Sequence, residues 1–244
     1  MIELAETQQA TDFSALQARY DGLSGSDLLR PMMELEFHRK IALVSSFGTE
    51  AAVLLALAAE IDPGIPVIFL DTGKLFGETF RYRDTLIKQL GLTDVRTVEP
   101  DPVELKTADP EGLLWQSRPD ACCHVRKTVP LERALKGFDA WITGRKRFQA
   151  STRAALSGIE LDVDGKIKVN PLASWSRDRI EAEFEKRGLP RHPLEADGFL
   201  SIGCMPCTDR VAPGQDPRSG RWAGLNKTEC GIHMSAASRN SSPI

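Results

Sequence analysis

The sequence predicts an α/β fold in which a parallel sheet carries helices on both faces. Short apolar runs typical of buried strands alternate with longer segments typical of helices, and this alternation indicates βαβ units. We predict strands at residues 41–44, 67–70, 95–98 and 140–143, with helices between them at 49–61, 76–90 and 121–135. Pro130 should break or kink the last of these helices, because proline lacks the N–H that a helix needs. The predicted architecture is Rossmann-like.

Further elements flank this alternating core. Residues 12–37 have the pattern of two helical segments before the first strand. Residues 159–170 resemble a hairpin around an Asp-Gly turn. Ser176 is a suitable N-cap for a helix that runs to about Arg187 and stops at Gly188.

The composition changes after residue 200. Residues 1–200 contain the strand and helix patterns and are predicted to form one nucleotide-binding α/β domain. Residues 201–244 are rich in Gly, Pro, Ser and Arg, without a sustained amphipathic period. Such a segment predicts a flexible C-terminal tail that wraps around the domain or moves.

Overall composition excludes some classes of function. Of the 244 residues, 41% are hydrophobic and 27% are charged, which is typical of a globular protein. A formal charge of −3 gives no support for nucleic-acid or membrane-surface binding. The sequence contains no apolar run of about 18 residues and begins without a signal-peptide pattern. We therefore expect a cytoplasmic protein with reduced thiols and with no nucleic-acid or membrane partner.

Four of the five cysteines form two close pairs. The pairs are Cys122 with Cys123, and Cys204 with Cys207. Adjacent cysteines on a helix point in different directions, so binding one zinc ion with both would strain the geometry. A 4Fe–4S cluster offers separate irons, and an all-cysteine ligand set is typical of it. The pairs favour one such cluster per chain, while zinc and metal-free thiols stay open as alternatives.

The fifth cysteine, Cys230, is a candidate nucleophile. A thiolate is intrinsically reactive, and Lys227 and His233 could favour it, whereas Glu229 would oppose it. The neighbouring Gly231 and the irregular context predict that the thiol is exposed.

Two loops follow predicted strands. Residues 45–50, Ser-Ser-Phe-Gly-Thr-Glu, precede a helix, and free N–H groups at a helix start can bind an anion. Residues 70–73, Leu-Asp-Thr-Gly, end the second strand, where Asp71 and Thr72 could contact a nucleotide. For the first loop, a tight strand-to-helix turn is about as good an explanation as anion binding. For the second, helix capping is about as good an explanation as nucleotide binding.

Arginines occur in two places that also carry other site signals. Residues 145–147, Arg-Lys-Arg, and Arg153 follow the fourth strand, and Arg218 and Arg221 lie in the tail. Guanidinium groups bind phosphate and sulfate oxygens well, although most surface arginines are only solvated charges.

As a set, these motifs resemble the adenylyl-sulfate (APS) reductases of sulfate assimilation, relatives of the 3′-phosphoadenylyl-sulfate (PAPS) reductases. The resemblance runs from the Ser-Ser-Phe-Gly-Thr-Glu loop to the tail, and it is carried by these motifs: L-D-T-G, C-C-H-V-R-K-T-V-P-L, T-G-R-K-R-F-Q-A-S-T-R, G-C-M-P-C-T, R-S-G-R-W and K-T-E-C-G-I-H. Ile232 is a mild departure, because the family usually has leucine there. The resemblance implies an adenine-nucleotide alpha-hydrolase-like fold related to the PP-loop ATP pyrophosphatases.

The resemblance also implies a cofactor, a reaction and a partner. The cofactor is one 4Fe–4S cluster per chain, and the reaction reduces APS to sulfite and AMP with thioredoxin as electron donor. Cys230 would attack the sulfur of APS, leaving an S-sulfocysteine, from which thioredoxin would release sulfite. With four thiols on the cluster, Cys230 has no internal partner, so the electrons must come from another dithiol protein.

The same resemblance assigns substrate contacts. The phosphate side of the nucleotide would be held by Ser45, Ser46, Phe47, Gly48 and Thr49. The adenosine would lie near Leu70 and Asp71. The phosphosulfate would contact Lys127, Arg153, Arg218, Arg221 and His233, with Trp222 packed beside them.

Two other functions remain open from the sequence. One is a PAPS reductase, although family members without the two cysteine pairs generally use PAPS, so the pairs favour APS. The other is an iron–sulfur redox sensor without catalysis, which would leave the phosphate-type loops and arginines unused. The sequence also leaves the oligomeric state open, a homo-oligomer included.

Overall fold

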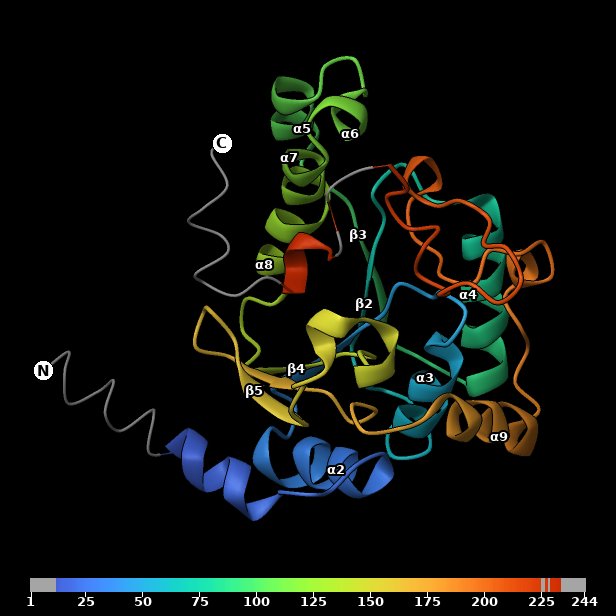
Figure 1. The fold of residues 1–244 in the computed structure, drawn as a ribbon. Coiled ribbons are helices and arrows are strands. Elements are labelled where there is room, and N and C mark those ends of the chain that lie inside the picture. Colours follow the sequence, from blue (N-terminus) through green and yellow to red (C-terminus); the bar gives the residue numbers. More distant parts are fainter. Residues whose placement is uncertain (1–11, 225–226, 228, 234–244) are drawn as a thin grey trace, which may run out of the picture.

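The computed structural model describes residues 12–224, 227 and 229–233. Its centre is a six-stranded sheet of order β3-β2-β1-β4-β6-β5 (Figure 1). The strands are β1 Ile41–Val44, β2 Val67–Leu70, β3 Val95–Val98, β4 Ala140–Ile142, β5 Ile159–Leu161 and β6 Ile167–Val169. The first four strands and β6 are parallel, whereas β5 is antiparallel to β6. The predicted α/β fold is confirmed, and the predicted hairpin forms the edge of the same sheet.

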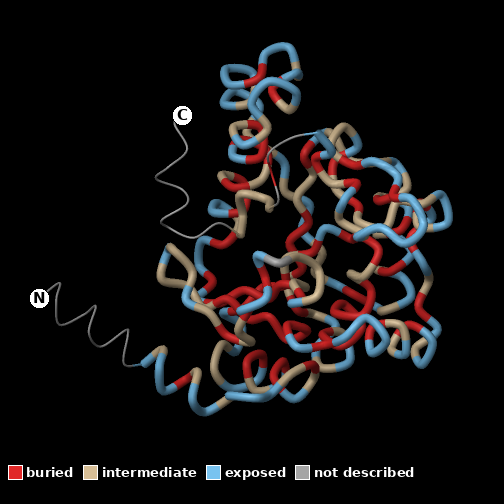
Figure 2. Tube along the Cα trace, viewed as in Figure 1, coloured by how far each residue is buried: buried red, intermediate tan, exposed pale blue. Residues whose placement is uncertain are grey.

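Helices cover both faces of the sheet. The helices are α2 Ser26–Pro31, α3 Ala51–Ala59, α4 Gly77–Leu90, α5 Pro102–Ala108, α6 Leu114–Ser117, α7 Pro119–Cys123, α8 Val129–Ala134 and α9 Arg177–Arg187, with π-helical turns η1 Met32–Glu36 and η2 His124–Thr128. Residues 12–19 are also helical. In Figure 2, buried positions concentrate on the strands and on the helix surfaces that face them.

The two faces have separate cores because successive strand side chains point in opposite directions. On one face Leu43, Val67 and Ile142 pack against α2, α3, α4 and α9. On the other face Ile68 and Trp141 pack against α8 and the residues that follow it. In register, Leu43 pairs with both Val67 and Ile142, so each face is continuous across the sheet.

Helix α9 begins and ends at the capping residues that the sequence predicts. The Ser176 side chain accepts a hydrogen bond from Arg179 N at 3.2 Å, and α9 ends at Gly188 with φ +56°. The short helix α5 was not predicted, although Asp101 caps it by accepting from Val103 N and Glu104 N. The signal for α5 was an Asp-Pro pair before a short segment with no buried residues.

Pro130 does not break the predicted helix. The chain stays helical from α7 through η2 into α8, and the π turn ends one residue before α8 begins. Pro130 then lies in the first turn of α8, where a missing N–H is tolerated. The wider turn thus accommodates the proline without ending the helix, and such turns are often found at functional sites.

The described part of the tail packs back onto the domain. The backbones of Cys204 and Leu75 form an isolated antiparallel β-bridge, and Met205 N donates a hydrogen bond to Lys74 O at 2.8 Å. Residues 231–233 form a 3-10 turn, η7 (Gly231–His233), that contacts η2 and lies beside α8 in Figure 1. The division at residue 200 and the movement of the tail stay predictions, and residues 234–244 lie outside the described part.

Within the described ranges, no helix is both long and apolar enough to cross a membrane.

Candidate functional site

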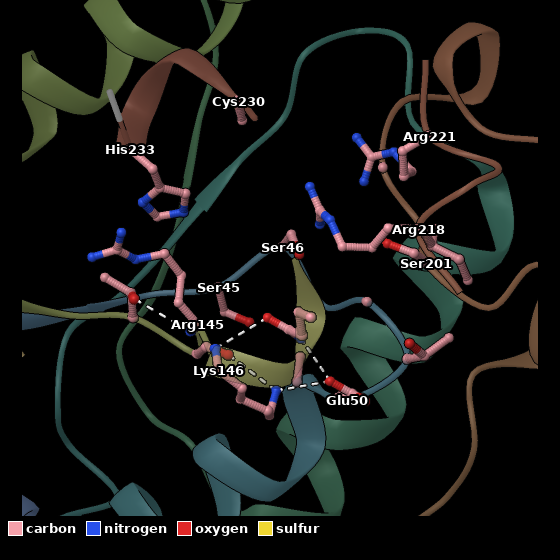
Figure 3. Close-up of a pocket in the computed structure, with 18 of the residues that line it drawn as sticks. Ser45, Ser46, Glu50, Arg145, Lys146, Ser201, Arg218, Arg221, Cys230 and His233 are labelled. Carbon is pink, nitrogen blue, oxygen red and sulfur yellow. Dashed lines mark hydrogen bonds and ion pairs between the residues drawn. The ribbon is translucent and has the colours of Figure 1, made fainter. Parts of the chain in front are cut away.

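A pocket opens beyond the carboxyl ends of β1, β2 and β4, where an α/β sheet is expected to bind ligands. Segments far apart in the sequence meet there: the loop after β1, the segment after β4, and the tail (Figure 3). Most of the predicted substrate residues line this pocket: Ser45, Ser46, Gly48, Thr49, Leu70, Lys127, Arg153, Arg218, Arg221, Trp222 and His233. The candidate nucleophile, Cys230, lines it with them.

Phe47 and Asp71 are outside the lining. The Phe47 ring is fully buried and packs edge-on against Phe69 at 5.4 Å. The Asp71 carboxylate accepts a hydrogen bond from Gly73 N at 2.8 Å, so it shapes its own turn. Phe47 has φ +47°, a rare value for a bulky residue, which suggests that this loop is held in a strained conformation next to the pocket.

A chain of polar side chains fixes one wall of the pocket, and the sequence did not predict it. Lys146, almost completely buried, donates to Glu50 Oε2 at 2.8 Å. Gln149 Nε2 donates to the same oxygen at 2.7 Å, and Gln149 Oε1 accepts from Arg153 Nη1. Gln149 therefore links Arg153 to the Lys146–Glu50 pair.

Five arginines line the pocket, and three of them, Arg153, Arg218 and Arg221, are among the predicted substrate residues. Burial, together with the nearby Arg153 charge, lowers the pKa of Arg218 to about 10, so it stays protonated at neutral pH. Arg221 lies over the Trp222 ring, 4.4 Å from its centroid. Trp222 is itself at φ +52°, a second strained residue at the site. Clustered guanidinium groups of this kind have enough donors to bind phosphate or sulfate.

The backbone of Gly203 lies directly against Arg221. A Cβ at this position would lie 2.3 Å from Arg221 Nη2. Glycine is therefore required for Arg221 to keep its place in the pocket.

Cys230 is half-buried in the pocket, whereas the sequence predicted an exposed thiol. A hydrogen bond from the protonated Cys123 thiol lowers the pKa of Cys230, and the charges of Lys127 and Arg221, which do not depend on that proton, lower it further against the effect of burial. Lys227, one of the two groups predicted to favour the thiolate, instead pairs with Asp120.

His233 was the other group predicted to favour the thiolate. Its ring stacks on Trp141, with centroids 5.9 Å apart and planes 5° apart. Burial first, and then the charges of Arg145 and Lys168, lower the pKa of His233, so the ring is neutral at pH 7. Its Nδ1 is buried and has no hydrogen-bond partner among the described residues. His233 therefore offers the pocket a polar ring nitrogen without a charge.

The four paired cysteines line one small cavity beside the pocket: Cys122, Cys123, Cys204 and Cys207. Burial raises the pKa of Cys122 to about 11 and also raises the pKa of Cys207. Within the described ranges, no three His, Cys, Asp or Glu side chains are already arranged as a metal site. The placement therefore brings both predicted pairs together without showing a coordination geometry.

The charges around this cavity fit a negatively charged cluster. Lys74, Arg126 and Lys127 line it, and no carboxylate is among its lining residues. Arg126 Nε is buried and has no hydrogen-bond partner among the described residues. Arg126 pairs with Asp109, whereas Lys127 has no carboxylate partner among the described residues, so a thiolate-bound cluster would place a negative charge against Lys127. We conclude that the donor set and its surroundings fit a 4Fe–4S cluster.

Lys127 and Trp222 line both the pocket and the cysteine cavity. Burial opposes the charge of Lys127, but the nearby sulfurs of Cys204, Cys230 and Cys123 outweigh it and raise the pKa of Lys127. Lys127 thus carries a stable positive charge between the two sites.

Together, the fold and the site define an α/β protein with a cationic pocket at the end of its sheet and a cysteine of the C-terminal segment among the residues that line it. Comparison with known proteins gives the family. The chain belongs to the phosphoadenosine phosphosulfate reductase domain family, whose model matches residues 40–210.

Relatives with high sequence identity have a consistent name. The chain is 51% identical over 231 residues to a Mesorhizobium japonicum protein named adenosine 5′-phosphosulfate reductase, covering 95% of this chain and 91% of that one. It is 45% identical over 197 residues to a Mycolicibacterium smegmatis protein of the same name, covering 79% and 82%.

Solved structures agree on the fold. A Candida auris phosphoadenylyl-sulfate (PAPS) reductase in a phosphate complex superposes with a TM-score of 0.68 at 26% identity, covering 82% of this chain and 96% of that one. Candida glabrata FMN adenylyltransferase superposes with a TM-score of 0.52 at 16% identity, covering 75% of this chain and 60% of that one, which supports a shared fold alone.

Proposed function

We propose that this protein reduces adenosine 5′-phosphosulfate to sulfite and AMP in cytoplasmic sulfate assimilation, with thioredoxin as electron donor. The observation that carries the proposal is that Cys230 lines the same pocket as Arg153, Arg218 and Arg221. A nucleophilic thiol beside a cluster of guanidinium groups suits attack on a bound phosphosulfate. The name shared by the relatives at 45–51% identity supports the same substrate.

In the first half-reaction, the Cys230 thiolate attacks the sulfur of APS. A bond forms between the two sulfur atoms, the bond from sulfur to the bridging oxygen breaks, and AMP leaves with the bonding electrons. Negative charge grows on the departing phosphate, and the fixed charges of Arg153, Arg218 and Arg221 stabilise it. Lys127 stabilises the attacking thiolate, because its charge lowers the pKa of Cys230.

In the second half-reaction, a thiolate of reduced thioredoxin attacks Cys230 and sulfite leaves. The resulting mixed disulfide is resolved by the second thiol of thioredoxin, so the dithiol supplies both electrons. Cys230 is half-buried, so a protein donor requires residues 201–244 to act as a mobile tail.

We assign the paired cysteines, Cys122, Cys123, Cys204 and Cys207, as the ligands of one 4Fe–4S cluster. When bound, the cluster supplies a fixed negative charge and ties the tail to α7, without passing electrons to the substrate. Lys127 lies between that charge and the substrate pocket.

A single-turnover experiment tests this function. Enzyme mixed with APS and no reductant should release one AMP per active site, and Cys230 should gain the mass of a sulfonate. Cys230→Ser should keep the iron content and lose the AMP burst. Cys204→Ser should lose the cluster, and unchanged iron content in that variant would refute the ligand assignment.

Two further measurements separate the alternatives. A higher kcat/KM for PAPS than for APS would assign the chain to PAPS reduction, the activity named for the Candida auris structure. Absence of any burst in iron-loaded protein would favour a redox sensor. Failure of reduced thioredoxin to discharge the S-sulfo form would exclude thioredoxin as donor.

A further inference from the structure

Glu229, the residue before Cys230, occupies the fork of the Arg153 guanidinium. Its Oε1 accepts a hydrogen bond from Arg153 Nε at 2.6 Å, and its Oε2 accepts one from Nη2 at 2.7 Å. Arg218 Nη2 lies 3.7 Å from the same Oε2. Two parallel bonds from one guanidinium are also the way in which arginine binds phosphate and sulfate.

The other side of Arg153 is already held by the protein. Its Nη1 donates to Gln149 Oε1, and Gln149 is in turn anchored on Glu50. The Arg153 side chain is only 8% exposed, and that of Glu229 is 19% exposed, so bulk water screens the pair little. An anion that binds Arg153 through the fork must therefore displace Glu229.

We propose that Glu229 is a positioning residue that acts as a resident anion. It competes with the phosphosulfate for Arg153, and it returns after sulfur transfer to expel the phosphate of AMP. This inference rests on the proposed function, because it assigns an order of events to the same pocket. Since Glu229 and Cys230 are adjacent in the chain, the exchange also shifts the thiol.

The charge of the product explains why such a device is useful. Sulfur transfer leaves AMP with a phosphate monoester, whose charge at pH 7 is about −1.5 to −2. The phosphate end gains charge as its sulfate leaves, so Arg153 and its neighbours hold the product more tightly than they held the same phosphate in the substrate. A carboxylate one residue from Cys230 shortens the lifetime of this complex by competing for the same donors.

The test is direct binding of AMP by isothermal titration calorimetry to iron-loaded protein. Glu229→Gln keeps the size of the side chain and removes its charge, so AMP should bind about tenfold more tightly, or 1.4 kcal/mol. AMP should also become a stronger inhibitor of turnover by a similar factor. Glu229→Asp keeps the charge on a shorter arm and should give an affinity between wild type and Glu229→Gln.

Asp120→Asn is the matched control. It removes the pair with Lys227, another anchor of the tail, and leaves Arg153 and Glu229 untouched. AMP affinity in this variant should stay within about twofold of wild type, a change of less than 0.5 kcal/mol.

Two outcomes would overturn the inference. One is AMP affinity that is unchanged or weaker in Glu229→Gln, which would leave Glu229 a purely structural anchor. The other is an equal gain in Asp120→Asn, which would show that a looser tail is sufficient. Failure of the proposed function is distinguishable, because it would appear as loss of the AMP burst in wild type, whatever the Glu229 variants bind.

Discussion

Removing one partner of the buried ion pair between Asp109 and Arg126 should be one of the most destabilising single substitutions in this protein. Asp109 Oδ2 accepts from Arg126 Nη2 at 2.7 Å, and its Oδ1 accepts from Leu114 N at 2.9 Å. Arg126 Nη1 donates to Thr72 O, also at 2.7 Å. The Asp109 side chain is 2% exposed and that of Arg126 is 7% exposed. The pair joins η2, the start of α6 and the loop after β2 around the cysteine cavity.

Asp109→Ala should lower the free energy of unfolding by about 4 kcal/mol. Removing one partner of a buried pair costs about 3–5 kcal/mol, because the remaining charge stays buried without compensation. The Leu114 N–H also loses its hydrogen-bond acceptor, and this second unsatisfied group adds to the cost. The expected loss of stability therefore lies in the middle of the range of about 3–5 kcal/mol. Burial alone would raise the pKa of Asp109, but the hydrogen bonds from Arg126 and Leu114 N outweigh it and lower the pKa. The carboxylate is therefore ionised at neutral pH, where the measurement is made.

The assay is urea unfolding followed by tryptophan fluorescence, with wild type and variants in the same cofactor state. Glu34→Ala is the matched control, because Glu34 and Arg30 are also 2.7 Å apart but are 46% and 55% exposed. That control should cost about 0.5 kcal/mol or less. A loss below about 1 kcal/mol for Asp109→Ala would refute the reasoning, because it would make the buried pair equal to an exposed one.

Two other substitutions test the pocket and its support. Gly203→Ala should weaken AMP binding about tenfold. The new Cβ would lie 2.3 Å from Arg221 Nη2 and would displace that flexible side chain from the pocket. Gly77→Ala is the control, because its Cβ would lie 3.6 Å from Arg81 Nη1, and it should leave AMP affinity unchanged in the same titration. His192→Asn should flatten the dependence of stability on pH. Burial lowers the pKa of His192 to about 4, so the unfolded chain takes up a proton between pH 7 and pH 5 that the folded chain does not. As the pH falls from 7 to 5, the free energy of unfolding of wild type should therefore decrease by about 2 kcal/mol through this residue, and that of the variant should not.

Each of these two predictions has a clear contrary result. Equal AMP affinities for Gly203→Ala and wild type would mean that Arg221 is not needed for the phosphate. Parallel stability curves for wild type and His192→Asn would mean that His192 takes up its proton in the folded state. In wild type, His192 Nδ1 accepts a hydrogen bond from Leu194 N at 3.2 Å. The asparagine side chain can accept the same hydrogen bond, so the variant removes the titrating group and keeps the cap.

Local signals were sufficient to predict most of the framework. Ser176 and Gly188 set the ends of α9 because capping and the left-handed conformation depend on the residues themselves. The apolar runs of β1, β2 and β4 indicated strands, because they are buried on both sides of a parallel sheet. β3 has a mixed burial pattern, yet its β-branched residues gave the same signal.

Long-range contacts could not be predicted in the same way. The sequence placed Glu229 beside Cys230 as an unfavourable charge, but its partner Arg153 lies 76 residues earlier. Lys146 was part of a recognised basic motif, but its partner Glu50 lies 96 residues away. Nothing local distinguishes such residues from solvated charges, because their role depends on which sheet edge the fold brings them to.

Lys127 lines both the pocket and the cysteine cavity, and its charge acts on the Cys230 thiol. Several other cations around the two cavities have resident carboxylates: Arg153 has Glu229, Lys146 has Glu50, Arg145 has Glu160 and Arg126 has Asp109. No carboxylate pairs with Lys127 in the described part of the chain, and the groups that raise its pKa are sulfurs of both sites. The π turn η2 carries Lys127 one turn beyond the cysteine pair, so one helical segment places Cys122, Cys123 and this charge. Under the proposed function, the charge of Lys127 would act on both the cysteine cavity and Cys230, so a cluster bound by the neighbouring thiols would change the reactivity of Cys230.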